Sequence, residues 1–380
     1  MDITIQKTIT FILFICIGLL LKLKFKSKEE VNGIKKIILN LALPATIFIA
    51  LLGIKVESNL LILPLLALAL NFLIYYSSSF LLPLAGIEKK SPEYRTARLL
   101  VASLAPGLSC FPFVLEFLGE DYLAKAAMAD LGNKIFVLIV LYIIAMNWYY
   151  KQRSIVKESN HSKIKSLLLA LLYEPVNLFI TIALILIFFG LSLNTLPFFI
   201  TDTLSRLSVI MTPLVLLFIG LAVKIKRKDF LKLLSMLALR AGLVVLIIGI
   251  FVVIAQISVQ NDILLLLSFG LSACSFWPFA HISAISSKEI DIPKRQQTFD
   301  TTFAVNILAL SFPFSTILIL GILSSGNSFS TAIPIFILAT VLLVLGLIPF
   351  TIKKIIGVKI SPYKHKIKWL RFKATTTENL

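Results

Sequence analysis

The sequence contains few charged residues, and acidic residues are the scarcest of them. Charged residues make up 15% of the 380 positions, with 19 Asp and Glu against 37 Lys and Arg and a formal net charge of +18. Soluble domains carry about 25% charged residues. The hydrophobic fraction is 58% and the mean hydropathy is +0.96. So few polar side chains cannot cover that much apolar surface in water. The composition therefore excludes a soluble enzyme and a disordered chain, and predicts an integral membrane protein.

Cysteine and histidine are also rare, with three residues of each. Cys16, Cys110 and Cys274 all lie within apolar runs. We interpret them as small buried residues rather than as a disulfide framework or a zinc site. The motifs HExxH, GxSxG and GxxxxGKS/T do not occur in the sequence, and these motifs mark metalloproteases, serine hydrolases and nucleotide-binding loops. The sequence predicts no enzyme, no cofactor and no metal site.

Eleven apolar runs are long enough to cross the ~30 Å hydrocarbon core of a bilayer. They are residues 5–21, 37–53, 60–84, 99–118, 123–148, 167–191, 207–223, 231–255, 263–285, 299–323 and 332–352. The sequence thus predicts an all-α polytopic membrane protein with eleven transmembrane spans.

The basic residues are distributed unevenly between these runs. Nearly all of them lie in the gaps after the first, third, fifth, seventh and ninth runs and in the C-terminal tail. Short loops retain positive charge on the cytoplasmic side, so we expect the N-terminus outside and the C-terminus in the cytoplasm, in the plasma (cell inner) membrane. The basic excess is explained by topology and by attraction to anionic lipid. The lipid bilayer is therefore the expected partner and nucleic acid is not, while a homodimer stays open.

The first five spans and the next five share the positions of their prolines. Pro44 in the second span corresponds to Pro213 in the seventh, and Pro112 in the fourth corresponds to Pro278 in the ninth. Because each half has an odd number of spans, the second half enters the membrane with opposite polarity. Such inverted repeats are typical of secondary transporters. The predicted units are a first five-helix repeat (1–152), an inverted second repeat (153–325), and an extra span with a basic tail (326–380).

We expect the fourth and ninth spans to be broken near the middle of the bilayer. A proline has no N–H and frees the carbonyl four residues earlier. Backbone freed at this depth is tolerated where it is buried in protein or faces water, and the N-terminus of a half-helix favours an anion. The alternative is that the prolines only kink packed helices. The candidate substrate-binding residues at the two breaks are Pro106, Gly107, Ser109, Pro112, Ser275 and Pro278.

Polar residues inside membrane spans are costly and mark functional sites. Lys134 lies near the middle of the fifth span, with Asn133 before it and Asp130 one helical turn away on the same face. Two interpretations stay open: Lys134 and Asp130 neutralise each other, or Lys134 holds a substrate carboxylate. Asn133, Lys134 and Asn306, which lies in the tenth span, complete the predicted substrate site.

Two further charged residues in the predicted spans are not expected to contribute to this site. Arg240 lies one or two turns from the cytoplasmic end of the eighth span, and a side chain of that length can extend to the interface. Glu174 lies at the inner end of the sixth span, where a carboxylate also reaches water. We therefore expect both side chains to be interfacial.

Three segments resemble the auxin efflux carrier family, within the bile acid:sodium symporter superfamily. They are LALPATIF (41–48), TPLVLLFIG (212–220) and SACSFWPFAHISAISSKEIDIPKRQQTFDTT (272–302), and the resemblance extends over roughly residues 5–323. It implies a scaffold of spans 1, 2, 6 and 7 and a transport domain of spans 3–5 and 8–10. Broken helices 4 and 9 would cross at the substrate site, at Pro112 and Pro278, and transport would be elevator-like. The substrates of the family are organic anions.

The sequence departs from the pattern of this family at two places. Many members have an Asn-x-Gly run before the proline of span 4, whereas APGLSCFP (105–112) has Ala105 at the asparagine position and retains Gly107. The eleventh span is also unusual. The predicted function is a secondary transporter, either proton-coupled or uncoupled, for a small organic anion such as a carboxylate. The alternatives are a sodium-coupled symporter of the bile acid type and a non-transporting membrane sensor or scaffold.

Overall fold

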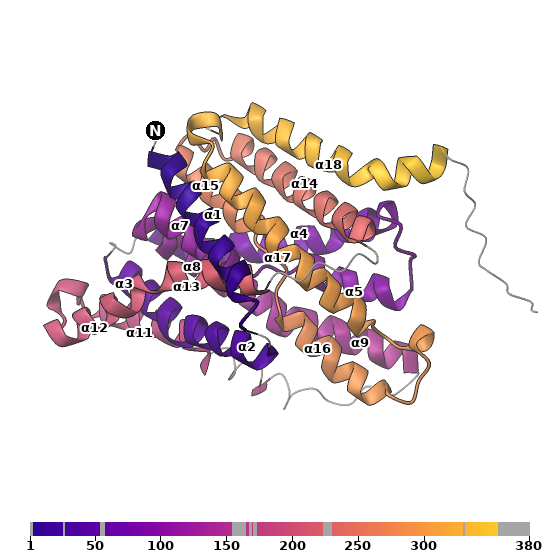
Figure 1. Ribbon diagram of the computed structural model, residues 1–380, viewed down its shortest axis with the longest axis horizontal. Coiled ribbons are helices and arrows are strands. Elements are labelled where there is room, and N and C mark those ends of the chain that lie inside the picture. Colours follow the sequence, from indigo (N-terminus) through magenta and orange to yellow (C-terminus); the bar gives the residue numbers. More distant parts are fainter. Residues whose placement is uncertain are drawn as a thin grey trace, which may run out of the picture.

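The computed structural model describes residues 3–25, 27–53, 58–153, 165–166, 169, 173–222, 230–329 and 331–355, and in these residues the regular structure is helical, with no strand. The helices form one bundle, in which α18 lies along α14 and α12 projects to one side (Figure 1). The α-helices are α1 (Ile3–Leu21), α2 (Lys28–Ile37), α3 (Leu43–Gly53), α4 (Leu63–Leu84), α5 (Pro92–Val101), α6 (Pro106–Ser109), α7 (Phe111–Leu118), α8 (Glu120–Ile135), α9 (Leu141–Arg153), α11 (Pro175–Phe188), α12 (Phe198–Val209), α13 (Met211–Ala222), α14 (Phe230–Ile254), α15 (Gln260–Gly270), α16 (Trp277–Ser286), α17 (Thr301–Leu323) and α18 (Ala332–Ile355).

Six helical stretches of the described chain are long and apolar enough to cross a membrane. They are Glu29–Gly53, Leu60–Leu84, Glu120–Arg153, Phe198–Leu221, Phe230–Ile254 and Thr301–Leu323. Shorter apolar helices cover Gln6–Leu21, Pro175–Phe188 and Ala332–Ile348. The predicted fourth and ninth spans are each divided into shorter helices. The described chain is therefore all-helical with helices that could cross a membrane, while the count of eleven spans stays a prediction.

The outer surface of the bundle is rich in large apolar side chains. A water-soluble monomer rarely exposes contiguous apolar patches of more than a few hundred Å², whereas lipid tails are as apolar as leucine. Such a surface suits a lipid environment. Examples on α1, α4, α12 and α18 that are at least 48% exposed are Ile12, Leu13, Leu20, Leu65, Phe80, Phe198, Ile333 and Ile337.

Glycines allow α1 to pack directly on the backbone of α13. A Cβ atom at Gly18 would lie 2.3 Å from the carbonyl oxygen of Leu217, and one at Gly220 would lie 2.2 Å from that of Ile15. Both distances are far shorter than a contact between carbon and oxygen allows, so larger residues would push the helices apart. Small residues bring membrane helices together in this way.

The helices pack in two groups. In the first, α1 contacts α13, and α3 contacts α11 and α12. In the second, α4 packs on α8 and α5, α17 packs on α5 and α15, and α16 packs on α9. The last helix, α18, joins the second group through α14. The two groups meet where α3 contacts α8.

Two short π-helical turns interrupt the long helices of the predicted second and fifth spans. They are η1 (Ile38–Ala42), between α2 and α3, and η3 (Phe136–Val140), between α8 and α9. The first ends two residues before Pro44, whose missing N–H disturbs the regular α-helical bonding. In the second, the carbonyl oxygen of Val137 lies 3.0 Å from Nε2 of His281 in α16. Such π turns often occur at functional sites.

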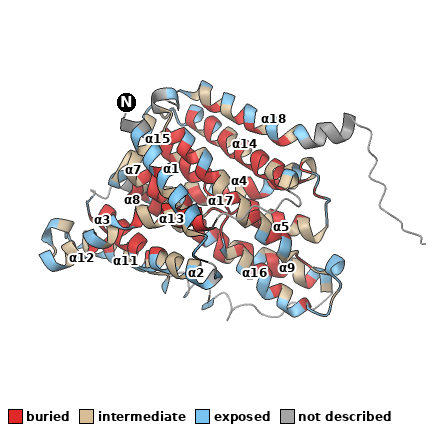
Figure 2. Cartoon of the chain, in the orientation of Figure 1, coloured by how far each residue is buried: buried red, intermediate tan, exposed pale blue. Residues whose placement is uncertain are grey.

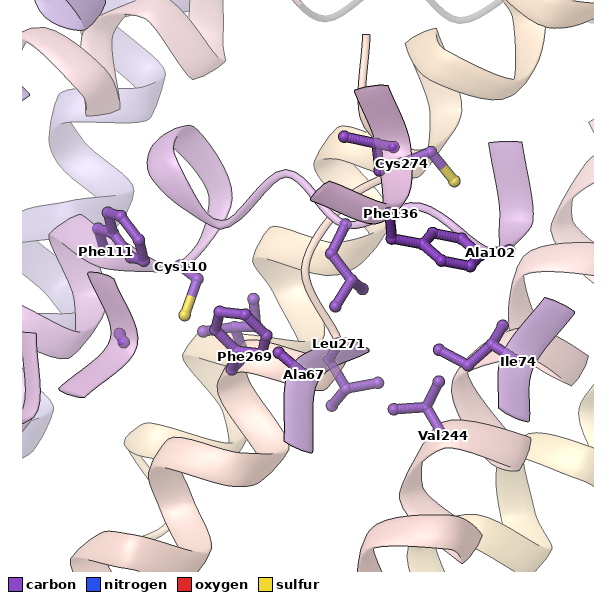
Figure 3. Close-up of a cluster of buried hydrophobic side chains, with 14 of the residues drawn as sticks. Ala67, Ile74, Ala102, Cys110, Phe111, Phe136, Val244, Phe269, Leu271 and Cys274 are labelled. Carbon is purple, nitrogen blue, oxygen red and sulfur yellow. The ribbon is translucent and has the colours of Figure 1, made fainter. Parts of the chain in front are cut away.

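Buried residues gather in the middle of the bundle, whereas α12 has one buried residue, Leu204, and is otherwise exposed or half-buried (Figure 2). Figure 3 shows part of this core, in which Cys110 and Cys274 lie among apolar side chains that include Phe136 and Leu271. These two cysteines are buried as predicted. The prediction was wrong for Cys16, which is exposed on α1, because that face of α1 belongs to the apolar outer surface.

Candidate substrate site

Two unwound segments meet inside the second group of helices. Residues 102–105 connect α5 to α6, and residues 271–276 connect α15 to α16. The backbone N–H of Ala105 donates to the carbonyl oxygen of Ala273 at 2.8 Å. The two broken helices are thus joined directly through their backbones, and we call this meeting point the crossing.

Serine hydroxyls accept hydrogen bonds from the N–H groups that the unwinding leaves without a helical partner. Ser109 Oγ accepts from the N–H of Ala273 at 3.0 Å, and Ser103 Oγ accepts from that of Ser275 at 2.9 Å. The N–H of Cys274, which lies between Ala273 and Ser275, donates to Ser311 Oγ of α17 at 3.3 Å. Unsatisfied backbone groups at this depth would cost several kcal/mol each, so these hydroxyls are part of what keeps the crossing unwound.

The prolines lie beside the breaks rather than at them. Pro112 and Pro278 are the second residues of α7 and α16, and Pro106 is the first residue of α6. A proline in the first helical turn loses no hydrogen bond, because the N–H groups there have no partner in the helix. The expectation that the helices cross at Pro112 and Pro278 is therefore corrected. Pro106 directly follows residues 102–105, Pro278 lies two residues after residues 271–276, and Pro112 lies one short helix beyond residues 102–105.

Asn133 attaches α8 to the first unwound segment. Its Nδ2 donates to the carbonyl oxygen of Leu104 at 3.0 Å, and its Oδ1 accepts from the N–H of Leu104 at 3.2 Å. Further bonds join Asn133 to Asp130 at 2.8 Å and to Asn71 of α4 at 3.0 Å. Because one side chain completes both backbone groups of Leu104, it replaces the bonds that a continuous helix would make.

Lys134 is 7% exposed and lies between two carboxylates. Its Nζ is 3.4 Å from Oδ2 of Asp130 and 3.0 Å from Oε2 of Glu174. It also donates to Oδ1 of Asn177 at 2.9 Å. The structure thus supports the interpretation of a self-neutralised pair and adds a second carboxylate. Glu174 was expected to be interfacial, but it precedes α11 and reaches inward to this ammonium group.

Arg240 of α14 is 2% exposed, and the expectation that it reaches the membrane interface was wrong. Its Nε donates to the carbonyl oxygen of Val101 at 2.8 Å. Its Nη2 donates to those of Ser103 at 3.1 Å and Ser272 at 2.9 Å. The side chain therefore extends to the crossing and binds both unwound segments.

A cavity of about 130 Å³ opens beside the crossing. The predicted site residues that line it are Pro106, Gly107, Asn133, Lys134 and Ser275. Four other predicted residues are not among its lining. Ser109, Pro112 and Pro278 are buried next to the crossing, and Asn306 is half-buried on α17. The remaining lining residues are Lys35, Leu39, Leu43, Leu104, Ala105, Leu108, Asp130, Val137, Glu174, Val176, Phe276 and Trp277.

Like Glu174, Lys35 is a charged lining residue that the sequence did not indicate. Its Nζ lies 4.2 Å from the ring centre of Phe276, which directly precedes α16. Among the described residues, Lys35 has no carboxylate within ion-pair distance. In the sequence it is one of several lysines before the second span, and only the packing of α2 against the crossing distinguishes it from them.

Comparison with known proteins gives one informative relative. No family model matches the chain. A protein of Methanocaldococcus jannaschii with the name uncharacterized transporter MJ1031 is 30% identical to the chain over 209 residues, which is 53% of this chain and 63% of that protein. The chain thus matches less than two thirds of its relative's length. This similarity and the apolar helices together suggest a membrane transporter.

Proposed function

We propose that the protein is a secondary transporter of the auxin efflux carrier type, which moves a small organic anion such as a carboxylate. In this proposal the anion binds in the cavity beside the crossing, and the site binds and releases it without catalysing a reaction. The protein would lie in the plasma membrane with its N-terminus outside and its C-terminus in the cytoplasm, as the basic loops predict.

The observation that carries the proposal is a helix N-terminus and a lysine without a carboxylate partner among the described residues, which lie at one end of this cavity. The N-terminal end of α16, at Ser275, Phe276 and Trp277, lines it, and the N-terminus of a helix carries roughly half a positive unit charge. Lys35 adds an ammonium group at the same end. Lys134, Asp130 and Glu174 also line the cavity, and the two carboxylates already occupy the ammonium group of Lys134. Among the described residues, Lys35 is therefore the lining cation that remains for a substrate carboxylate.

The position of the cavity supports an elevator-type movement. Lys35, Leu39, Leu43 and Val176 come from the first group of helices or the segments joined to it, whereas Asn133 and Ser275 come from the second. The substrate would therefore bind at the boundary between a scaffold and a transport domain. In this proposal the first group is the scaffold of spans 1, 2, 6 and 7, and the second group is the transport domain of spans 3–5 and 8–10 of the inverted repeat.

Ligand-induced thermal stabilisation of the purified protein tests this proposal. A panel of small carboxylates is added to the wild type, Lys35→Gln and Lys36→Gln. Lys36 is the exposed neighbour of Lys35 on the same helix, so it controls for a general loss of positive charge. We expect one or more carboxylates to raise the melting temperature of the wild type and of Lys36→Gln, and to leave that of Lys35→Gln unchanged.

Two outcomes would contradict the proposal. Equal stabilisation of all three proteins would remove Lys35 from the site. Stabilisation by sodium or by an uncharged solute, with none by any anion, would overturn the anion as substrate and favour the sodium-coupled alternative.

A further inference from the structure

Arg240 is the one arginine that binds both unwound segments within the described residues. Its three acceptors are backbone carbonyl oxygens, and among those residues no carboxylate lies within ion-pair distance of its guanidinium group. A buried charge is costly unless it is compensated. The compensation for Arg240 therefore comes from carbonyl dipoles.

These carbonyl groups belong to two helix ends. Val101 is the last residue of α5, and Ser272 lies two residues after the end of α15. The C-terminus of a helix carries roughly half a negative unit charge. One guanidinium group thus faces two such ends, and their combined partial charge is about equal and opposite to its own.

In transporters with broken helices, unwound carbonyl groups and the C-terminal ends of half-helices coordinate the coupling cation. Here a side chain of the protein occupies that electrostatic position. Arginine suits it because the guanidinium group stays charged when buried and its donors are fixed in one plane.

We propose that Arg240 is a resident cation, which holds the two broken helices together in the place of a bound metal ion. It is a positioning residue, since it contacts the backbone of the crossing and not the cavity. The structural role of Arg240 does not depend on the proposed function. A corollary is that transport needs no sodium, because the cation site is already filled, and this corollary alone rests on the proposed function.

The test is chemical rescue of the purified full-length protein, followed by thermal unfolding. Arg240→Ala removes the cation and leaves a space lined by carbonyl oxygens. Guanidinium chloride at millimolar concentration is the probe, and urea, which has a similar shape and no charge, is its control. Leu239→Ala is the matched variant, because Leu239 is the adjacent residue of α14 and packs against Gly346 of α18 instead.

We expect both variants to melt at a lower temperature than the wild type. Guanidinium should restore at least half of the loss in Arg240→Ala and none in Leu239→Ala, and urea should restore neither. Arg240→Ala without a response to guanidinium, or an equal response of both variants, would overturn the proposal, because an arginine that only fills space leaves no cation site behind.

A second pair of variants keeps the test decisive if Arg240→Ala does not fold. Arg240→Lys retains the charge, whereas Arg240→Gln retains hydrogen-bond donors without charge. The proposal expects the lysine variant to melt at the higher temperature of the two, and equal melting temperatures would overturn it. None of these results depends on transport, so the proposal can stand if the proposed function fails. Sodium-dependent transport by the wild type would contradict the corollary alone.

Discussion

Replacement of Lys134 tests whether this residue acts mainly as a counter-charge inside the protein. Its ammonium group lies 3.0 Å from Glu174 and 3.4 Å from Asp130, with side-chain exposures of 8%, 22% and 6% for the three residues. Removing one partner of a buried ion pair costs about 3–5 kcal/mol, because the remaining charge is left uncompensated. Since Glu174 is partly exposed, we expect Lys134→Met to lose stability near the lower end of that range.

The double variant Lys134→Met with Glu174→Gln distinguishes charge balance from other roles. The single change adds one uncompensated negative charge to the cluster, and the second change removes one, so the double variant has the net charge of the wild type. We expect it to recover most of the lost unfolding free energy, measured by detergent-driven unfolding of the purified protein. A double variant as unstable as Lys134→Met, or a single variant as stable as the wild type, would refute the reasoning.

Two further predictions concern the packing of α8. A Cβ atom at Gly132 of α8 would lie 1.8 Å from the carbonyl oxygen of Pro64, so Gly132→Ala should destabilise the protein by about 1–3 kcal/mol through overpacking. Its control is Gly33→Ala, where no atom beyond the neighbouring backbone of the same helix lies within 4 Å of the new Cβ and where alanine should stabilise the helix by up to about 1 kcal/mol. Asn133→Leu leaves both backbone groups of Leu104 without their partner, at about 1–3 kcal/mol for each buried group, and thermal unfolding beside the wild type measures the loss. Wild-type stability of either destabilising variant would contradict the packing described for α8.

Local sequence signals predicted much of the site. Prolines in two apolar runs predicted the broken helices, because a proline is unfavourable inside a helix and favoured in its first turn. The spacing of Asp130 and Lys134 predicted their contact, because residues four apart lie on one face of a helix. Both inferences needed only nearby residues, and the structure contains both the broken helices and the contact between Asp130 and Lys134.

The rest of the site depends on residues that are distant in the sequence. Arg240 binds Val101 and Ser272, and its role at the crossing appears only once three segments are packed together. Lys35 meets Phe276 through the packing of α2 against the start of α16. No helical periodicity or motif connects these positions. The one available signal was an arginine within an apolar run, and its position near the end of the span led to the interpretation that it was interfacial.

Transport by the reconstituted protein tests the central claim most directly. The purified wild type and Lys35→Gln are placed in liposomes loaded with an unlabelled carboxylate, and entry of the labelled carboxylate is followed without a sodium gradient. The account predicts exchange by the wild type and a strong loss of exchange in Lys35→Gln. Exchange of no carboxylate by a folded wild type, or equal exchange by both proteins, would contradict it.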